Sequence, residues 1–162
     1  MEFKIKNKWL SLGGSSQVQD MHDNDVYFVK GKIATVSSKK FLCDLEGNTL
    51  YVIKRKVFSL FGRTAYVCDK NETVVAKIRR KIFSLHDHYY IYSPKGEMTI
   101  RGNILEFNYN ITLNGQEIGH VARKISLRDH FVLSLPDDSD YAFFIALVIA
   151  IDNITDNKDA QY

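Results

Sequence analysis

The sequence predicts a mainly β fold: a closed antiparallel barrel of about twelve strands around a central, C-terminal hydrophobic α-helix. Three observations lead to this prediction. A run of eleven apolar residues, YAFFIALVIAI, occupies positions 141–151. A KxxSL-like motif recurs along the chain with a nearly constant spacing. Short segments of alternating apolar and polar residues, separated by turn signals, fill the positions before the apolar run, as expected for consecutive β-hairpins.

The repeated motif sets the length of the structural unit. Its copies are NKWLSL (7–12), GKIATV (31–36), RKVFSL (55–60), RKIFSL (80–85), RGNILEF (101–107) and RKISL (123–127), of which the second and fifth are degenerate and the last is one residue short. The lysines of the first four copies are separated by 24, 24 and 25 residues (8 to 32, 32 to 56, 56 to 81). This period suits two strands with their two turns.

The expected strands follow from β-rich runs between turn signals. In chain order they cover 3–8, 26–31, a short strand near Lys32, 39–45, 50–58, 64–69, 73–83, 88–93, 98–102, 105–113, 117–125 and 130–135. Asn114-Gly115 is the strongest signal for a tight type I′ turn. In 73–83 one face is apolar and the other is mostly cationic: Val74, Ala76 and Ile78 oppose Val75, Lys77, Arg79 and Lys81. Such one-sided strands indicate an antiparallel sheet.

A closed barrel hides the apolar faces of these strands and leaves no exposed sheet edge. About twelve strands enclose more space than their own side chains fill, so the interior needs a plug. The run 141–151 meets that need, because it lacks a polar face and is shorter than the roughly 20 residues that cross a bilayer as a helix. Asp137, Asp138, Ser139 and Asp140 are candidate N-caps, and Asp152-Asn153 is the expected start of the exit.

Composition bounds the class of protein. A chain of 162 residues with a net charge of +3 and a pI near 8.8 suits one globular domain with a mild preference for anionic surfaces. We expect a single domain over 1–155 and a polar tail over 156–162. Cys43 and Cys68 are expected to be reduced. Since there is no signal peptide or lipidation motif, the expected location is the cytoplasm, with peripheral membrane association as an alternative.

These segments resemble the Tubby C-terminal-like superfamily, and most closely the bacterial LURP-one-related proteins. The residues that carry the resemblance are 26–32, 45–60, 79–85, 101–111, 123–131 and 137–152. The resemblance implies the barrel around a C-terminal helix and a kinship with the Tubby proteins and the phospholipid scramblases. It does not imply scramblase activity, because the scramblases' acidic calcium-binding segment is not recognisable here. Nor is there a residue-by-residue match to Tubby's phosphoinositide-binding lysine and arginine pair.

The candidate ligand-binding residues are cations on alternating strand positions: Lys54, Lys56, Lys77, Arg79 and Lys81. Aligned in the sheet, they would form one basic face able to hold anionic lipid headgroups or a phosphorylated or acidic partner. A solvated outer face that opposes aggregation is the structural alternative. The predicted function is therefore a non-enzymatic binding or scaffold module, with a protein-interaction module without lipid binding as the alternative.

Other chemistries have less support in the sequence. His86, Asp87 and His88 suggest a metal site, but a zinc site needs three or four ligands, and we expect ordinary turn residues. No serine or cysteine has the neighbours of a nucleophile, so we predict no catalytic residue, metal or cofactor, and an enzyme ranks third. Nucleic acid is disfavoured, because barrel alternation already explains the interleaved basic and aromatic residues.

Overall fold

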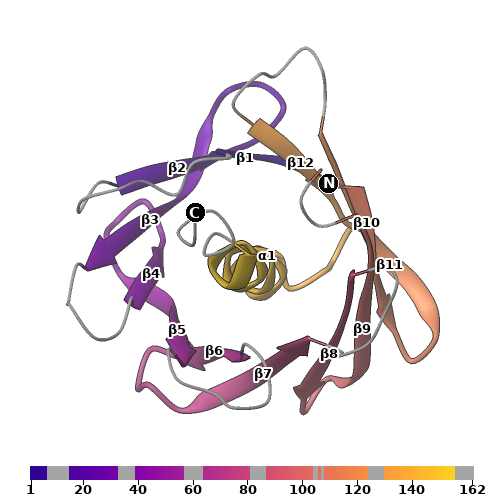
Figure 1. Ribbon diagram of the computed structural model, residues 1–162. Coiled ribbons are helices and arrows are strands. Elements are labelled where there is room, and N and C mark those ends of the chain that lie inside the picture. The colour runs from indigo at the N-terminus through magenta and orange to yellow at the C-terminus, as the bar shows by residue number, and fades with distance from the viewer. Residues whose placement is uncertain are drawn as a thin grey trace, which may run out of the picture.

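The computed structural model describes residues 1–6, 15–32, 39–56, 64–80, 87–103, 106, 108–123 and 130–155. Within these residues, twelve strands form one closed antiparallel barrel, in which each strand pairs with its neighbours in the chain and β1 closes against β12 (Figure 1). The predicted fold class is thus confirmed. The strands are β1 (Glu2–Lys6), β2 (Ser15–Gln19), β3 (Asp25–Lys32), β4 (Lys39–Cys43), β5 (Thr49–Lys56), β6 (Thr64–Asp69), β7 (Val74–Arg80), β8 (Asp87–Ser93), β9 (Gly96–Asn103), β10 (Asn108–Leu113), β11 (Gln116–Arg123) and β12 (His130–Ser134).

The sequence period corresponds to a pair of strands. Each of the six motif copies begins within two residues of the last residue of an odd-numbered strand, from β1 to β11. Most of each copy lies outside the described residues, except in RGNILEF (101–107), of which the structure describes residues 101–103 and 106. The hairpin repeat predicted from the spacing is therefore present as two strands per period.

The same period recurs in the turns at the opposite end of the barrel. Three of these turns begin at Asp20, Asp44 and Asp69. In each, the Asp backbone N–H donates to the carbonyl four residues later at 2.9–3.0 Å, and the carboxylate accepts that residue's N–H at 2.8–3.0 Å. The residue three positions after each Asp has a positive φ: Asp23 at 66°, Gly47 at 95° and Glu72 at 63°. Aspartate suits this position because its side chain bonds backbone groups a few residues ahead.

The strand assignments differ from the sequence prediction in two places. Strand β2 was not predicted, because SSQVQ is polar apart from Val18, which is buried. The short strand expected near Lys32 is the end of β3. The count of twelve was therefore correct, although one of its members was misplaced. The predicted extensions to residues 58, 83 and 125 lie outside the described residues.

The predicted inner face of 73–83 is wrong at one position. Val74 is 53% exposed, whereas Ala76 and Ile78 are buried as expected. The pairing register of β6 with β7 shifts between Val67 and Cys68, so that Cys68 pairs with Val74 and Val67 with Ala76. The extra residue in β7 is a β-bulge, which interrupts the alternation that the sequence suggested.

The barrel encloses α1 (Tyr141–Thr155), as Figure 1 shows. Every side chain from Phe143 to Ile151 is at most 5% exposed, so the predicted central helix is confirmed. Its N-cap is Asp140, whose Oδ1 accepts the Phe143 N–H at 3.2 Å. The helix continues past the expected end at 151, and Asp152 and Asn153 are helical and buried. In the described part of the chain, no helix is both long and apolar enough to cross a membrane.

Candidate functional site

The sheet register places four of the five predicted cation positions in two cross-strand rows. In the first row, Lys54 of β5 pairs with Tyr66 of β6, and Tyr66 pairs with Lys77 of β7. The second row runs through Lys56, Thr64 and Arg79. Because neighbouring strands are about 4.8 Å apart, the Cα atoms of Lys54 and Lys77, which lie on either side of β6, are about 10 Å apart. The Lys56 side chain and all of Lys81 lie outside what the structure describes.

Lys54 already has a counter-ion. Glu72, from the turn between β6 and β7, accepts hydrogen bonds from Lys54 Nζ at 2.5 Å and from Lys39 Nζ at 3.1 Å. The hydrogen bond that Lys54 donates to Glu72 raises the pKa of Lys54, and the bonds from the two lysines lower the pKa of the Glu72 carboxyl. A ligand anion would have to compete with Glu72, so Lys54 is a secondary contact at most.

Lys77 and Arg79 differ from Lys54 in having no counter-ion. Neither has a hydrogen-bond or ion-pair partner among the residues that the structure describes. On β8, Lys77 pairs with Tyr92, which is 58% exposed, and Arg79 pairs with Tyr90. The outer surface of β7 therefore presents two available cations, Lys77 between two tyrosines and Arg79 beside one. This chemistry suits phosphate or carboxylate groups.

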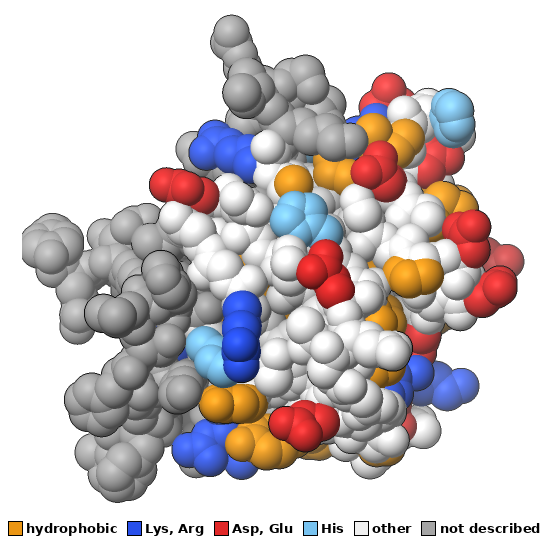
Figure 2. Space-filling view, turned by 90° about the vertical axis from the view of Figure 1, so that its right-hand side faces the viewer, with side chains coloured by type: hydrophobic (Ala, Val, Ile, Leu, Met, Phe, Trp, Pro, Cys, Tyr) orange, Lys and Arg blue, Asp and Glu red, His pale blue; other side chains and the backbone are white. Residues whose placement is uncertain are grey.

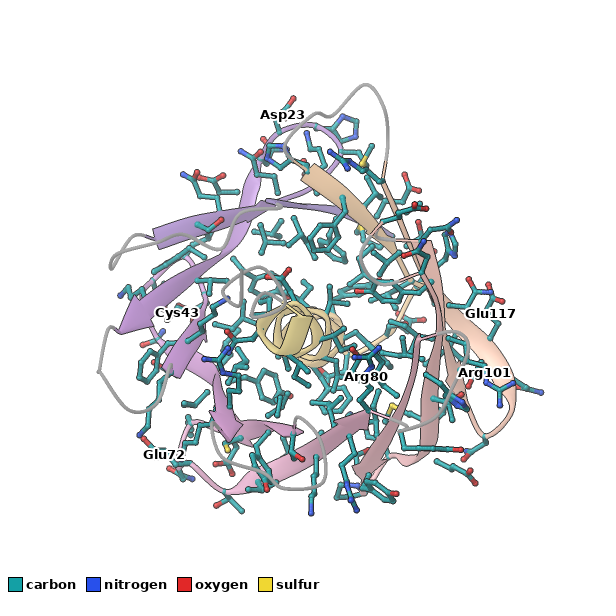
Figure 3. All side chains as sticks on the ribbon, in the orientation of Figure 1. Asp23, Cys43, Glu72, Arg80, Arg101 and Glu117 are labelled. Atoms are coloured by element: carbon teal, nitrogen blue, oxygen red, sulfur yellow. The ribbon has the colours of Figure 1, made fainter. Side chains whose placement is uncertain are left out.

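Other cations of β4, β5 and β7 point into the barrel. Arg55 Nη1 donates to the Asn153 carbonyl of α1 at 3.2 Å, and Lys40 Nζ lies 4.0 Å from the Asp152 carboxylate. Figure 3 shows Arg80 inside the barrel near α1, whereas the labelled Glu72 and Arg101 point outward. Cations at the C-terminal end of a helix interact favourably with its dipole. Arg55 and Arg80 thus contribute to the interior rather than to the basic face.

A pocket of about 460 Å³ lies on the outer surface of β9 and β10. It is lined by Glu97, Thr99, Arg101, Thr112, Asn114 and Gly115. Figure 2 looks at this side of the barrel, where side chains of both charges are scattered rather than gathered by sign. Sequence reasoning did not find this pocket, because its lining comes from two strands and a turn and forms no local motif.

The family follows from comparison with known proteins. The model of the LURP-one-related family matches residues 1–152. This chain belongs to the LURP-one-related family. Among solved structures, it is similar to the X-ray structure of a protein from Arabidopsis thaliana, with a TM-score of 0.66 at 15% identity, over 94% of this chain and 91% of that chain. At this identity the likeness shows the fold alone. Comparison with curated proteins gives no match.

In this LURP-one-related protein, His88 lies in a strand, as predicted for 88–93, whereas the alternative description of residues 86–88 as ordinary turn residues is wrong for Asp87 and His88. Strand β8 begins at Asp87, and His88 is 7% exposed, while His86 lies outside the described residues. Its Nε2 accepts the Arg101 Nε–H at 3.3 Å, and its ring centroid lies 4.6 Å from that of Tyr90. Among the described residues, no three His, Cys, Asp or Glu side chains are grouped to hold a metal ion.

Cys43 and Cys68 are free and buried. Burial raises the pKa of the Cys68 thiol, which disfavours the nucleophilic thiolate. The family and the fold are consistent with a non-enzymatic binding module.

Proposed function

We propose that this LURP-one-related protein is a non-enzymatic binding module that holds phosphate-bearing, anionic lipid headgroups on the outer surface of β7. The observation that carries the proposal is the pair Lys77 and Arg79, two residues apart on one strand face and without partners among the described residues. Arginine offers a planar fork of donors to phosphate, and lysine adds a point charge. Lys54, Lys56 and Lys81, the other cations predicted from the sequence, would supplement this pair at its margins.

The aromatic residues around the pair fit an interfacial role. Tyr66 and Tyr92 flank Lys77 in the same cross-strand row. Tyrosine has an apolar ring and a polar hydroxyl, a combination that favours the boundary between headgroups and water. A cation near an anionic membrane contributes about 1 kcal/mol of attraction, so Lys77 and Arg79 together supply about 2 kcal/mol, or roughly a 30-fold gain in affinity.

A protein partner is the second candidate. Tyrosine and arginine are enriched in protein interfaces, and Tyr92 is 58% exposed beside Lys77. Such a partner would be recognised without any vesicle binding. An enzyme ranks third, because no catalytic arrangement of side chains is visible in the described ranges.

Co-sedimentation with vesicles tests the lipid proposal. We expect binding to phosphatidylcholine vesicles that contain an anionic lipid and none to phosphatidylcholine alone. The Lys77→Glu/Arg79→Glu double variant should bind at least about 30-fold more weakly. The matched control is Lys30→Glu/Lys70→Glu, which changes the net charge equally at two other exposed lysines.

Equal losses of vesicle affinity in the two double variants would mean that binding depends only on net charge. This result would overturn the assignment of the lipid-binding site to β7. Failure of the unaltered protein to bind at low salt would overturn lipid binding itself. Recovery of a defined protein partner, with vesicles ignored, would favour the second candidate.

A further inference from the structure

The pocket on β9 and β10 places opposite charges at its two ends. Glu97 and Arg101 both line it and both stand on the outer face of β9. They are four residues apart, so their Cα atoms are separated by about 13 Å along the strand. Both side chains are exposed to solvent at the rim. The pocket therefore has one anionic end and one cationic end.

The charge of Glu97 is not compensated within the described residues. Its backbone is fixed by Asn114, which donates its N–H to the Glu97 carbonyl at 2.7 Å and accepts the Glu97 N–H at Oδ1 at 3.1 Å. Its carboxylate has no hydrogen-bond or ion-pair partner there. Lys95, two residues away, is engaged with Asp140 at 2.9 Å. The carboxylate is thus available to an incoming cation.

Arg101 is positioned but only partly engaged. Its Nε donates to His88 Nε2 at 3.3 Å, which orients the guanidinium plane. Its two terminal amino groups have no acceptor among the described residues. A guanidinium held through Nε can still offer two parallel N–H groups to a carboxylate or a phosphate.

Neutral polar groups connect the two ends. Thr99 and Thr112 are paired across β9 and β10, with their hydroxyl oxygens 2.7 Å apart. The Asn114 side chain uses its oxygen for the Glu97 N–H, which leaves its amide nitrogen as a donor. A ligand of one charge would satisfy one end of the pocket and be repelled by the other end.

We infer that this pocket binds a small zwitterion, whose carboxylate or phosphate meets Arg101 and whose ammonium group meets Glu97. The polar floor accommodates the linker between the two charges. The ligand is either a free compound of this kind or the ethanolamine headgroup of a phospholipid, which has the same chemistry. This site adjoins the proposed lipid-binding face of β7, because Tyr92 of β8 pairs with both Lys77 and Glu97. The two sites use different charged residues, and the inference does not depend on the proposed function.

Titration with O-phosphoethanolamine, followed by calorimetry and by amide NMR shifts, tests the inference. We expect binding with shifts centred on Glu97, Arg101 and Asn114. Inorganic phosphate and ethylamine, which each carry one of the two charges, should bind at least about 10-fold more weakly. Glu97→Gln and Arg101→Gln should each weaken binding at least about 10-fold, whereas Glu46→Gln, a control in the turn between β4 and β5, should not.

Three results would overturn the inference: no shift at millimolar ligand, equal binding of phosphate alone, or unchanged binding in Glu97→Gln. Glutamine is nearly isosteric with glutamate, and a thermal melt checks that each variant is folded.

Failure of this inference is distinguishable from failure of the proposed function, because the Lys77→Glu/Arg79→Glu variant should still bind phosphoethanolamine. Neutral vesicles with and without phosphatidylethanolamine identify the source of the ligand. If the protein is retained only on vesicles that contain phosphatidylethanolamine, the ligand is the lipid headgroup. If the protein binds the soluble compound but not these vesicles, the ligand is a free compound.

Discussion

Asp140 is the residue at which the helix and the barrel wall are joined. Its carbonyl accepts the Phe144 N–H at 3.1 Å, and its carboxylate accepts the Phe143 N–H at 3.2 Å. The same carboxylate contacts Lys95 Nζ at 2.9 Å and accepts the Tyr51 hydroxyl at 3.4 Å. Burial and this neighbouring carboxylate raise the pKa of Tyr51 to about 12. One side chain therefore caps α1 and connects it to β5 and to the turn before β9.

Replacing Asp140 separates these two roles. Asp140→Ala should lower the free energy of unfolding by about 1–2 kcal/mol, because the cap is lost. Asp140→Asn should cost less, since asparagine also caps helices, but it should lower the pKa of Tyr51 just as alanine does. Urea unfolding and ultraviolet titration of the phenol measure the two effects. Asp138→Asn, in the neighbouring turn, is the control, and equal stability of Asp140→Ala and the unaltered protein would contradict the capping role.

At the scale of elements, α1 is the part whose burial is most complete. Leu147 is 0% exposed in the middle of the helix. Leu147→Asp would place a charge in the barrel without a partner, so we expect loss of the fold, with a cost above about 4 kcal/mol. Leu147→Met, which conserves volume, should cost less than about 1.5 kcal/mol. Circular dichroism and size-exclusion chromatography check both, and a soluble, fully folded Leu147→Asp variant would contradict the enclosed position of the helix.

The helix and the strands could be predicted where they follow from a local sequence pattern, and less well where they depend on pairing with other strands. The helix and the hairpin period follow from an apolar run and a repeated motif, and the Asn114-Gly115 turn has the two positive φ angles of type I′. Strand β2 was not predicted, because its polar residues form a strand only through pairing with β1 and β3. Val74 was misplaced because a bulge cannot be read from alternation alone.

The candidate site divides in the same way. Alternation correctly separates Lys54 from Arg55, since these neighbours lie on opposite faces of β5. It does not reveal that Glu72, from the next turn, neutralises Lys54. Nor can it indicate a pocket shared by β9 and β10, because Thr99 and Thr112 meet only through the register of the sheet. Counter-ions and pockets depend on which strands and turns lie next to one another, whereas the sequence pattern describes one strand at a time.

At the scale of the whole molecule, acidic and basic side chains gather at opposite ends of the helix that runs through the barrel. The turns at the end where α1 begins are rich in exposed carboxylates, among them those of Glu46, Asp137 and Asp138. The inward cations Lys40 and Arg55 meet the other end of the helix. This arrangement follows the helix dipole, because acidic groups gather near its N-terminus and basic groups near its C-terminus.

The turn carboxylates also determine how the barrel responds to acid. Hydrogen bonds from Asn24 and Asn48 lower the pKa of Asp20 and Asp44 below the ordinary value of 3.8. A lowered folded-state pKa means that the stabilisation is present above the unfolded-state pKa and is lost as the pH falls through the folded-state pKa. The melting temperature should therefore decline as the pH is lowered through and below about 4. Asp20→Asn/Asp44→Asn should decline less steeply between pH 5 and pH 3, because two titrating groups are gone while the asparagine Oδ1 still accepts the backbone N–H of Asn24 or Asn48. Melting curves across this range measure both slopes, and parallel slopes would show that the turn carboxylates do not control acid stability.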